Sequence, residues 1–184
     1  MPARADVFDL GRLKLTSGEG RRVELEVRLG FYQFAEDRYA AVPDPAPAVL
    51  DISRMTGNGY ALRLRFDASL EGPCMRCLEP ATPSYHVDAR EISQPGGGEE
   101  LQSPYLDRLE QLDLHGWAHE ALMLALPQQV VCRPECAGLC PECGANLDRD
   151  PGHAHEAAPD PRWAKLRELF PESGAGAGRP GGGS

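Results

Sequence analysis

Six cysteines in two groups constrain this chain more strongly than any other feature. Four of them fall within a stretch of twelve residues: Cys132, Cys136, Cys140 and Cys143. The other two form a Cys-Met-Arg-Cys sequence far upstream: Cys74 and Cys77. Packing alone does not call for thiols at this density, whereas metal ions bind thiolates that are two to four residues apart. The cysteines therefore predict a fold that is stabilised by metal.

The cellular compartment decides between a metal site and disulfides. The N-terminal sequence MPARADVFDLGRLKL lacks the apolar segment of a secretory signal, and no run of 18 apolar residues is present. We therefore expect a cytoplasmic chain that does not cross a membrane, and thiols stay reduced in that compartment. Three disulfides would also use six cysteines, but pairs with two or three intervening residues suit a metal better.

The net charge of −9 bears on the class of partner. Avid, nonspecific binding of nucleic acid relies on Lys and Arg, so an acidic chain is a poor general RNA coat. Arg63, Arg65 and Arg76 could contact phosphate locally. The solvated face of a sheet explains them more simply.

Alternating apolar residues predict a sheet in the first half of the chain. We expect strands at residues 21–29, 49–55, 60–70 and 85–92. The third has the clearest alternation, with six residues on one face: Tyr60, Leu62, Leu64, Phe66, Ala68 and Leu70. Gly57-Asn58-Gly59 supplies the positive-φ residues of a hairpin turn before it. The proline-rich residues 41–48 are expected to form a loop.

The second half of the chain changes character. We expect a flexible loop at residues 94–104, then a helix at residues 113–126 with Trp117, Ala121 and Leu124 on its apolar face. Asp160-Pro161 predicts the start of a short second helix after the Cys-rich stretch.

The expected fold class is α+β. An antiparallel sheet or partly open barrel occupies residues 1–93, and a helix, a zinc-binding loop region and a short C-terminal helix occupy residues 105–170. These parts are expected to form one domain of residues 1–170. Residues 171–184 are rich in Gly and are expected to be a disordered tail.

Six cysteines and two histidines supply eight ligands, enough for two tetrahedral zinc sites. Proximity in the sequence suggests one set with two imidazoles: Cys140, Cys143, His153 and His155. The second set is all thiolate and would tie the sheet to the C-terminal part: Cys74, Cys77, Cys132 and Cys136. A closed site with four protein ligands is structural, because it leaves no open position for water or substrate.

Other arrangements stay open at this point. A single ion could use the four cysteines of the dense cluster, which would crowd its ligands into twelve residues. The pair at residues 74 and 77 could instead join the pair at residues 140 and 143 as a zinc ribbon, and the two histidines could be a solvated loop. One or two ions would bind, and a rubredoxin-type iron site would use the same ligands.

The chain shows no catalytic motif. His115 and His119 have the i, i+4 spacing of a metalloprotease helix, but Gly116 stands where that helix needs Glu. We therefore expect these histidines on a solvated face. The chain has neither a phosphate-binding glycine loop nor a nucleophile elbow.

Four segments, taken in this order, resemble the YceD-like proteins, which are named for large ribosomal RNA subunit accumulation. They are EGPCMRCLEP (71–80), LDLHGWAHEALMLALP (112–127), VCRPECAGLCPECGANLD (131–148) and DPRWAKLREL (160–169). The combination is specific, although any one segment alone is weak. Many relatives carry Cys-x-Cys where this chain has His153-Ala154-His155, and His in place of Cys keeps a zinc ligand at each position.

The resemblance implies a bacterial or plastid protein without enzymatic activity. It would promote accumulation of 23S ribosomal RNA and hence large-subunit assembly. Its partner would be pre-ribosomal RNA or a large-subunit ribosomal protein, with no membrane and no small-molecule substrate. Two other classes stay open: a zinc-ribbon regulator that binds nucleic acid, and a thiol oxidoreductase that uses Cys74 and Cys77. No thioredoxin-like βαβ pattern surrounds that pair, which counts against the oxidoreductase.

Overall fold

A computed structural model describes residues 3–4 and 6–155 of the chain. Contacts divide the chain into two units, residues 1–150 and residues 151–184. The first unit contains these elements: β1 (Ala3–Arg4), β2 (Val7–Asp9), a 3-10 helix (Gly11–Leu13), β3 (Gly20–Val27), β4 (Phe31–Phe34), β5 (Asp37–Val42), β6 (Ala46–Arg54), a 3-10 helix (Thr56–Asn58), β7 (Tyr60–Pro73), β8 (Pro80–Ala81), β9 (Ser84–Ser93), a 3-10 helix (Glu99–Leu101), β10 (Gln111–Asp113) and α1 (Leu114–Ala125).

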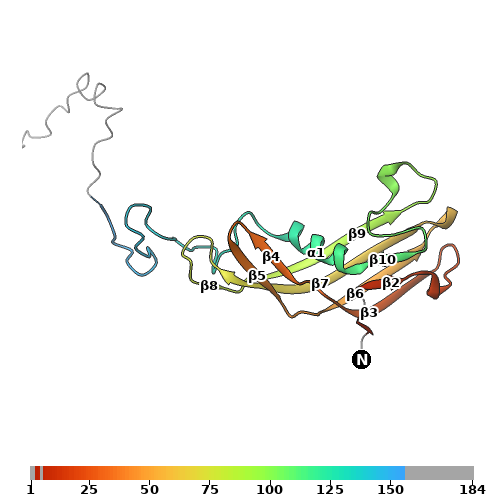
Figure 1. Ribbon diagram of the computed structural model, residues 1–184, viewed down its shortest axis with the longest axis horizontal. Helices are drawn as coiled ribbons and strands as arrows, with labels where there is room; N and C mark the ends of the chain where they lie inside the picture. Colours follow the sequence, from red (N-terminus) through yellow and green to blue (C-terminus); the bar gives the residue numbers. More distant parts are fainter. Residues whose placement is uncertain (1–2, 5, 156–184) are drawn as a thin grey trace, which may run out of the picture. The chain divides into compact units, whose positions relative to one another are not determined.

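Strand β7 is the strand on which the sheet is built (Figure 1). Along one edge it pairs antiparallel with β9, from Tyr60 to Ser69. Along the other edge it pairs first with β6 and then with β5. Its last two residues pair with β8, which continues the register of the β9 ladder. Its inward-facing side chains form one unbroken buried row: Tyr60, Leu62, Leu64, Phe66, Ala68 and Leu70. The strand predicted at residues 60–70, with these six on one face, is confirmed.

The sheet is open and antiparallel, apart from the short parallel pairing of β1 with β3. The strands predicted at residues 21–29, 49–55 and 85–92 correspond to β3, β6 and β9. Gly57 and Asn58 have positive φ in the turn between β6 and β7, whereas Gly59 is extended. A small second ladder joins β10 to β2. The predicted α+β fold, with an antiparallel sheet in the first half and a helix after it, is confirmed.

The loop predicted at residues 41–48 is wrong. Strand β5 runs to Val42 and β6 begins at Ala46, so only three residues connect them. Pro47 does not interrupt β6. It precedes Ala48, the first residue of β6 that pairs with β7, so its lack of an N–H costs no hydrogen bond to β7. The carboxylate of Asp44 fixes the connection by accepting hydrogen bonds from the backbone N–H groups of Leu29 (3.0 Å) and Gly30 (3.1 Å).

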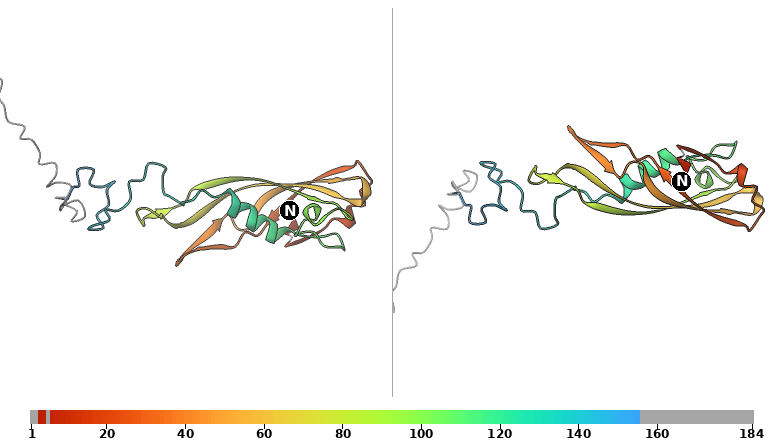
Figure 2. Two further views of the ribbon diagram at one scale, coloured as in Figure 1. Left: turned by 90° about the horizontal axis from the view of Figure 1, so that it is seen from above. Right: turned by 90° about the horizontal axis from the view of Figure 1, so that it is seen from below.

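Helix α1 lies across one face of the sheet and contacts β9, β2 and β3 (Figure 2). Its bounds agree with the predicted helix to within one residue at each end. The predicted apolar face is partly wrong. The buried residues are Leu114, Trp117, Ala118, Ala121 and Leu122, whereas Leu124 is 78% exposed. The helix therefore meets the sheet along a stripe that is rotated away from Leu124.

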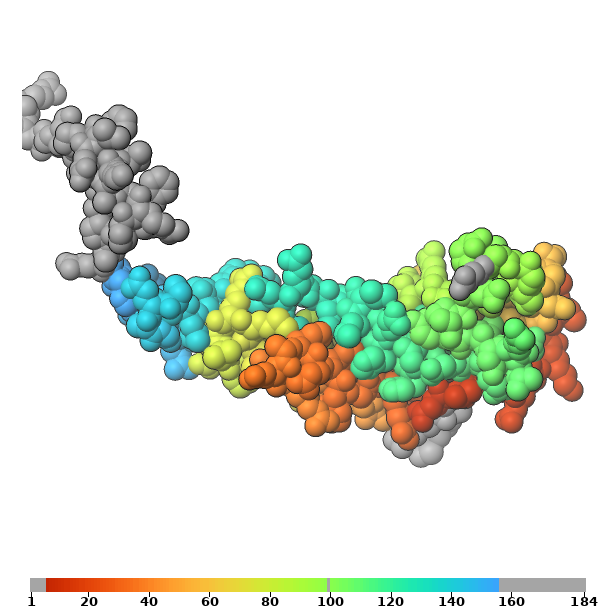
Figure 3. Space-filling view, turned by 45° about the horizontal axis from the view of Figure 1, so that its top comes forward, coloured from red at the N-terminus to blue at the C-terminus, as the bar shows by residue number. Residues whose placement is uncertain are grey.

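The β4–β5 hairpin bends to the side of the sheet that carries α1, and the two lie next to each other on the surface (Figure 3). The ring of Tyr32 on β4 stacks on His119 with 4.3 Å between ring centroids. His119 donates from Nδ1 to the carbonyl of Leu29 (2.8 Å), and His115 donates from Nδ1 to the carbonyl of Arg28 (2.9 Å). The expected solvated face is therefore wrong for His119, which anchors α1 to the segment between β3 and β4.

Asp113 caps the N-terminus of α1, since its Oδ1 accepts a hydrogen bond from the backbone N–H of Gly116 at 2.9 Å. Replacing Asp113 with Ala leaves that N–H without its partner and is expected to lower the free energy of unfolding by about 1 kcal/mol. Asp113→Asn keeps an equivalent acceptor and should stay close to wild type. Urea denaturation of the three proteins measures the difference, and equal losses for Ala and Asn would contradict the capping role.

Three further predictions concern residues outside these elements. Residues 94–104 contain the 3-10 helix Glu99–Leu101, and Gln94 donates its N–H to the carbonyl of Leu101 (2.7 Å); their flexibility stays a prediction. The helix predicted from Asp160 and the tail of residues 171–184 lie outside the described residues. Within the described residues, no helix combines the length and apolar character needed to cross a membrane.

Candidate metal centre

The first cysteine pair lies in a tight turn between β7 and β8. Cys74 follows the last residue of β7 and donates its N–H to the carbonyl of Glu79 (2.8 Å). Leu78 donates its N–H to the carbonyl of Cys74 (2.9 Å), which closes the turn. The N–H of Arg76 points at the sulfur of Cys74, with 3.4 Å between nitrogen and sulfur. The pair thus lies directly after the end of the longest strand.

The second pair reaches this turn after the end of α1. Met75, inside the turn, donates its N–H to the carbonyl of Val130 (2.9 Å). Val130 in turn donates its N–H to the sulfur of Met75 (3.2 Å). This reciprocal contact holds the incoming chain against the turn, and it places Cys132 and Cys136 opposite the first pair.

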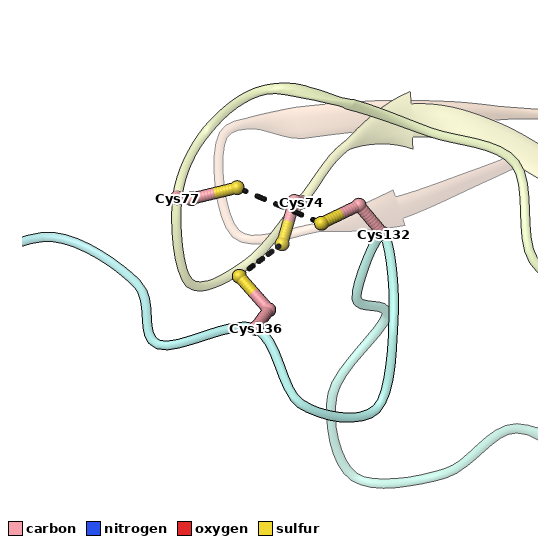
Figure 4. A group of neighbouring side chains, drawn as sticks. All are labelled: Cys74, Cys77, Cys132 and Cys136. Carbon is pink, nitrogen blue, oxygen red and sulfur yellow. Dashed lines mark hydrogen bonds between the residues drawn. The ribbon is translucent and has the colours of Figure 1, made fainter. Parts of the chain in front are cut away.

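The four thiols converge on one point (Figure 4). The sulfur of Cys74 lies 3.8 Å from that of Cys136, and the sulfur of Cys77 lies 3.8 Å from that of Cys132. All four sulfurs lie within 4.8 Å of one another. Tetrahedral zinc with bonds of about 2.3 Å places its sulfurs about 3.8 Å apart, whereas a disulfide needs about 2.05 Å. The spacing fits one metal ion, and these four residues could hold it.

Burial and hydrogen bonding give these thiols different pKa values. Burial raises the pKa of Cys74, but the N–H groups of Cys77, Arg76 and Cys132 outweigh it and lower that pKa to about 6. Burial, together with hydrogen bonding to Cys77, raises the pKa of Cys136 to about 12. A bound cation would favour the thiolate form of every ligand. Cys74 therefore ionises more readily than Cys136, and a bound cation would favour ionisation of both.

Sequence reasoning missed a positioning role for Arg76. Its Nε donates to Oε1 of Gln129 (2.9 Å), and its Nη1 donates to the carbonyl of Cys136 (3.1 Å). Gly138 has φ of +79° and lies so close that a Cβ there would be 3.0 Å from the carbonyl oxygen of Arg76. Arg76 therefore braces the second pair against the first. The position of Arg76 between Cys74 and Cys77 could have indicated this role.

The other half of the dense cluster folds as a second turn of the same kind. Gly144 donates its N–H to the carbonyl of Cys140 (2.8 Å), which repeats the bond from Leu78 to Cys74. Gly144 and Leu78 both have positive φ, of +74° and +61°. Glycine adopts this conformation at no steric cost, whereas leucine rarely does. Two similar turns, each with a Cys-x-x-Cys pair, therefore follow β7 and α1.

The second predicted ligand set is distributed over both compact units. The sulfurs of Cys140 and Cys143, in the first unit, lie within 4.8 Å of each other. In the second unit, Nε2 of His153 lies 2.9 Å from Nε2 of His155. Each pair thus has the proximity that shared coordination requires. The joining of these two pairs around one ion stays a prediction.

The arginines on the outer face of the sheet are paired with carboxylates. Arg63 makes two hydrogen bonds of 2.6 Å to Asp88, and these lower the pKa of Asp88 to about 2. Arg65 bonds Asp51 at 2.7 Å. Both arginines have carboxylate partners, which supports the simpler interpretation as a charged, solvent-facing sheet over that as a phosphate site.

Fold and site together define an α+β protein with an open antiparallel sheet and a four-cysteine cluster that could hold a metal ion. The cluster joins the end of the longest strand to the segment after the helix. The chain belongs to the YceD family: the family described as "Large ribosomal RNA subunit accumulation protein YceD" matches residues 62–170. The matched residues include β7 from Leu62 onward, the whole of α1 and all six cysteines.

Curated relatives occur in mycobacteria. An uncharacterized protein of Mycobacterium tuberculosis (strain H37Rv) is 43% identical over 108 residues, which cover 55% of this chain and 52% of that protein. An uncharacterized protein of Mycobacterium leprae is 43% identical over 59 residues, which cover 32% of this chain and 27% of that protein. The match spans about half the length, or less, of these relatives. No solved structure is significantly similar to this chain.

Proposed function

We propose that this chain is a non-enzymatic, cytoplasmic factor that promotes accumulation of 23S ribosomal RNA and thereby assembly of the large ribosomal subunit. The observation that carries the proposal is the family match over residues 62–170, whose family is described by large ribosomal RNA subunit accumulation. Its direct partner would be pre-ribosomal RNA or a large-subunit ribosomal protein.

The metal in this proposal is structural. Cys74, Cys77 and Cys136 are buried, and four thiolates complete a tetrahedral shell without a position for water. A catalytic zinc site instead keeps one position open for water or substrate. Zinc is the proposed ion, although iron takes the same four-cysteine shell. A second ion would use Cys140 and Cys143 with His153 and His155.

Deletion of the gene tests the proposed function. The ratio of 23S to 16S ribosomal RNA is expected to fall, and free large subunits should become scarce in a sucrose gradient. The wild-type gene should restore both, and so should Leu109→Ala, because Leu109 is 76% exposed and far in sequence from the cysteines. Cys77→Ser should restore neither, since the cluster would lose a ligand.

An unchanged RNA ratio with normal subunit profiles would remove the assembly role. It would leave the nucleic-acid-binding regulator, which does not predict a selective loss of 23S RNA. Full rescue by Cys77→Ser would show that the cluster is dispensable for the function, and the structural role of the metal would then be rejected separately.

A further inference from the structure

Strand β9 has one open edge. Within the described part of the chain, β9 pairs only with β7. The N–H of Leu70 donates to the carbonyl of Pro83 (3.1 Å), which extends the same ladder by one pair. Because hydrogen-bonded and non-hydrogen-bonded pairs alternate in an antiparallel ladder, Val87 and Ala89 direct their backbone groups toward β7. Asp88 and Arg90 therefore direct their N–H and C=O groups to the open edge.

A groove of about 320 Å³ runs along this edge. Five consecutive residues of β9, from Val87 to Glu91, line it. Successive side chains of a strand point to opposite faces of the sheet. A groove that is lined by five consecutive residues therefore follows the edge of the strand, where both faces and the backbone are reached. The wall opposite β9 is supplied by α1 and the loop before it: Tyr105, Trp117, Ala121, Leu124 and Ala125.

The groove combines an apolar wall with two acidic side chains: Glu91 lines it, and Glu120 bonds Tyr105, which also lines it. Leu124 is 78% exposed, although Ala121 and Trp117 beside it are buried. Tyr105 donates its hydroxyl to Glu120 (2.6 Å), and Glu91 lies close enough to help raise the pKa of Tyr105. Among the described residues, neither Glu120 nor Glu91 forms a salt bridge with Arg or Lys. The groove is thus complementary to basic side chains, whose charges would reach Glu91 and Glu120 while their aliphatic stems cover Leu124.

We propose that the open edge of β9 and its groove bind an extended, basic segment of another protein, which adds to the sheet as a further strand. The edge offers alternating N–H and C=O groups that only a peptide backbone matches along its length. Lys or Arg side chains that point to the α1 side would contact Glu91 and Glu120, and their aliphatic stems would cover Leu124. A phosphate backbone would instead face these two carboxylates. The proposal does not depend on the ribosomal role or on the metal.

The test uses the full chain and a capped, labelled ten-residue peptide that alternates Leu and Lys. Fluorescence anisotropy should show saturable binding, and a peptide that alternates Leu and Glu should bind at least about tenfold more weakly. Two further peptides carry N-methyl groups, one on every Leu and the other on every Lys. One of them should lose binding about tenfold or more and the other should keep it, because a bound strand points alternate N–H groups to β9.

Matched variants place the contact on β9. Arg90→Pro removes an N–H from the open edge but none from the ladder with β7, whereas Arg90→Ala keeps that N–H. Arg90→Pro should weaken binding about tenfold and Arg90→Ala less than about twofold. Leu124→Ala should also weaken binding. If Arg90→Pro fails to fold by circular dichroism, the pair of N-methylated peptides decides alone.

Several results would overturn the proposal. Equal binding of both N-methylated peptides would exclude strand addition. Equal binding of folded Arg90→Pro and Arg90→Ala would move the contact away from this edge. Absence of saturable peptide binding, or displacement of the peptide by a ten-nucleotide oligouridylate at equal concentration, would reject a protein segment as the occupant.

Discussion

Cys132→Ser is expected to remove one metal ion per chain and to lower the free energy of unfolding by about 4 kcal/mol when the free metal is at a thousandfold of its dissociation constant. The reason is that Cys132 lies 3.8 Å from Cys77 in a cluster of four sulfurs, and a hydroxyl is a poor substitute for a thiolate. Elemental analysis of the purified, reduced protein measures the metal, and urea denaturation measures the stability.

Cys132→His is the matched control. Imidazole is also a zinc ligand, and Cys132 is only partly buried, so the larger ring has room at the rim of the cluster. This variant should keep its metal and most of its stability. In EDTA, wild type and Cys132→Ser should unfold at nearly the same urea concentration. The cluster would be rejected as a metal site if Cys132→Ser kept the wild-type metal content.

The wild-type protein is expected to bind about two zinc ions per chain, because eight ligands complete two tetrahedral shells. Cys143→Ser should then remove one ion and leave the other, independently of Cys132→Ser. A single ion, together with free alkylation of Cys74 and Cys77, would contradict both the stoichiometry and the pairing. Elemental analysis also distinguishes zinc from iron.

Trp117→Ala is expected to lower the free energy of unfolding by about 3–5 kcal/mol. Trp117 is only 2% exposed and stacks on Tyr105 with ring centroids 6.3 Å apart. Its removal leaves a cavity between α1 and the sheet that the rigid strands cannot fill. Leu124→Ala, on the same helix, should change stability by less than about 0.5 kcal/mol, because that side chain is 78% exposed.

Urea denaturation of the two helix variants checks this contrast, since the midpoint should shift strongly for one and hardly at all for the other. Equal shifts would mean that α1 presents the face that the sequence pattern predicts, with Leu124 against the sheet. The two variants together thus test the rotation of the helix as well as its packing.

The sequence was informative where one physical requirement dominated a segment. In β7 the period-two alternation extends over six buried residues, and one shift of register would expose all of them, so the pattern had one solution. Helix α1 was equally clear in its extent, because Asp113 caps it and Pro127 follows it. Its rotation was not, since Ala121 and Leu124 fit two neighbouring stripes equally well.

The β4–β5 hairpin could not be predicted from its local sequence. Tyr32 and Tyr39 are almost completely buried, yet their packing depends on partners far along the chain: Tyr32 on His119, and Tyr39 on the carbonyl of Pro73 (2.8 Å). Such tertiary contacts leave no periodic signal in six residues. Prolines at residues 43, 45 and 47 further suggested a loop. However, β6 contains Pro47 as its second residue, before the residues that pair with β7.

The four ligands of the cluster were predicted, but the contacts that bring the two cysteine pairs together were not. Spacing alone placed Cys74 and Cys77 in one half-site, and proximity placed Cys132 and Cys136 in another. The spacing of the ligands does not predict which contacts hold the two cysteine pairs against each other. That role falls to Arg76 and to the backbone contacts of Met75, whose partners lie more than fifty residues away.

The separation of 62 residues between Cys74 and Cys136 has a consequence for the chain during its own synthesis. At a translation rate of about 5–20 residues per second, Cys136 follows Cys74 by roughly 3–12 s. Strands β8 to β10 and α1 are synthesised during this interval, and until Cys132 is added only two of the four thiols exist. A nascent or truncated chain that ends before Cys132 cannot complete the shell. Metal retention by this site would therefore mark a chain whose synthesis has passed Cys136.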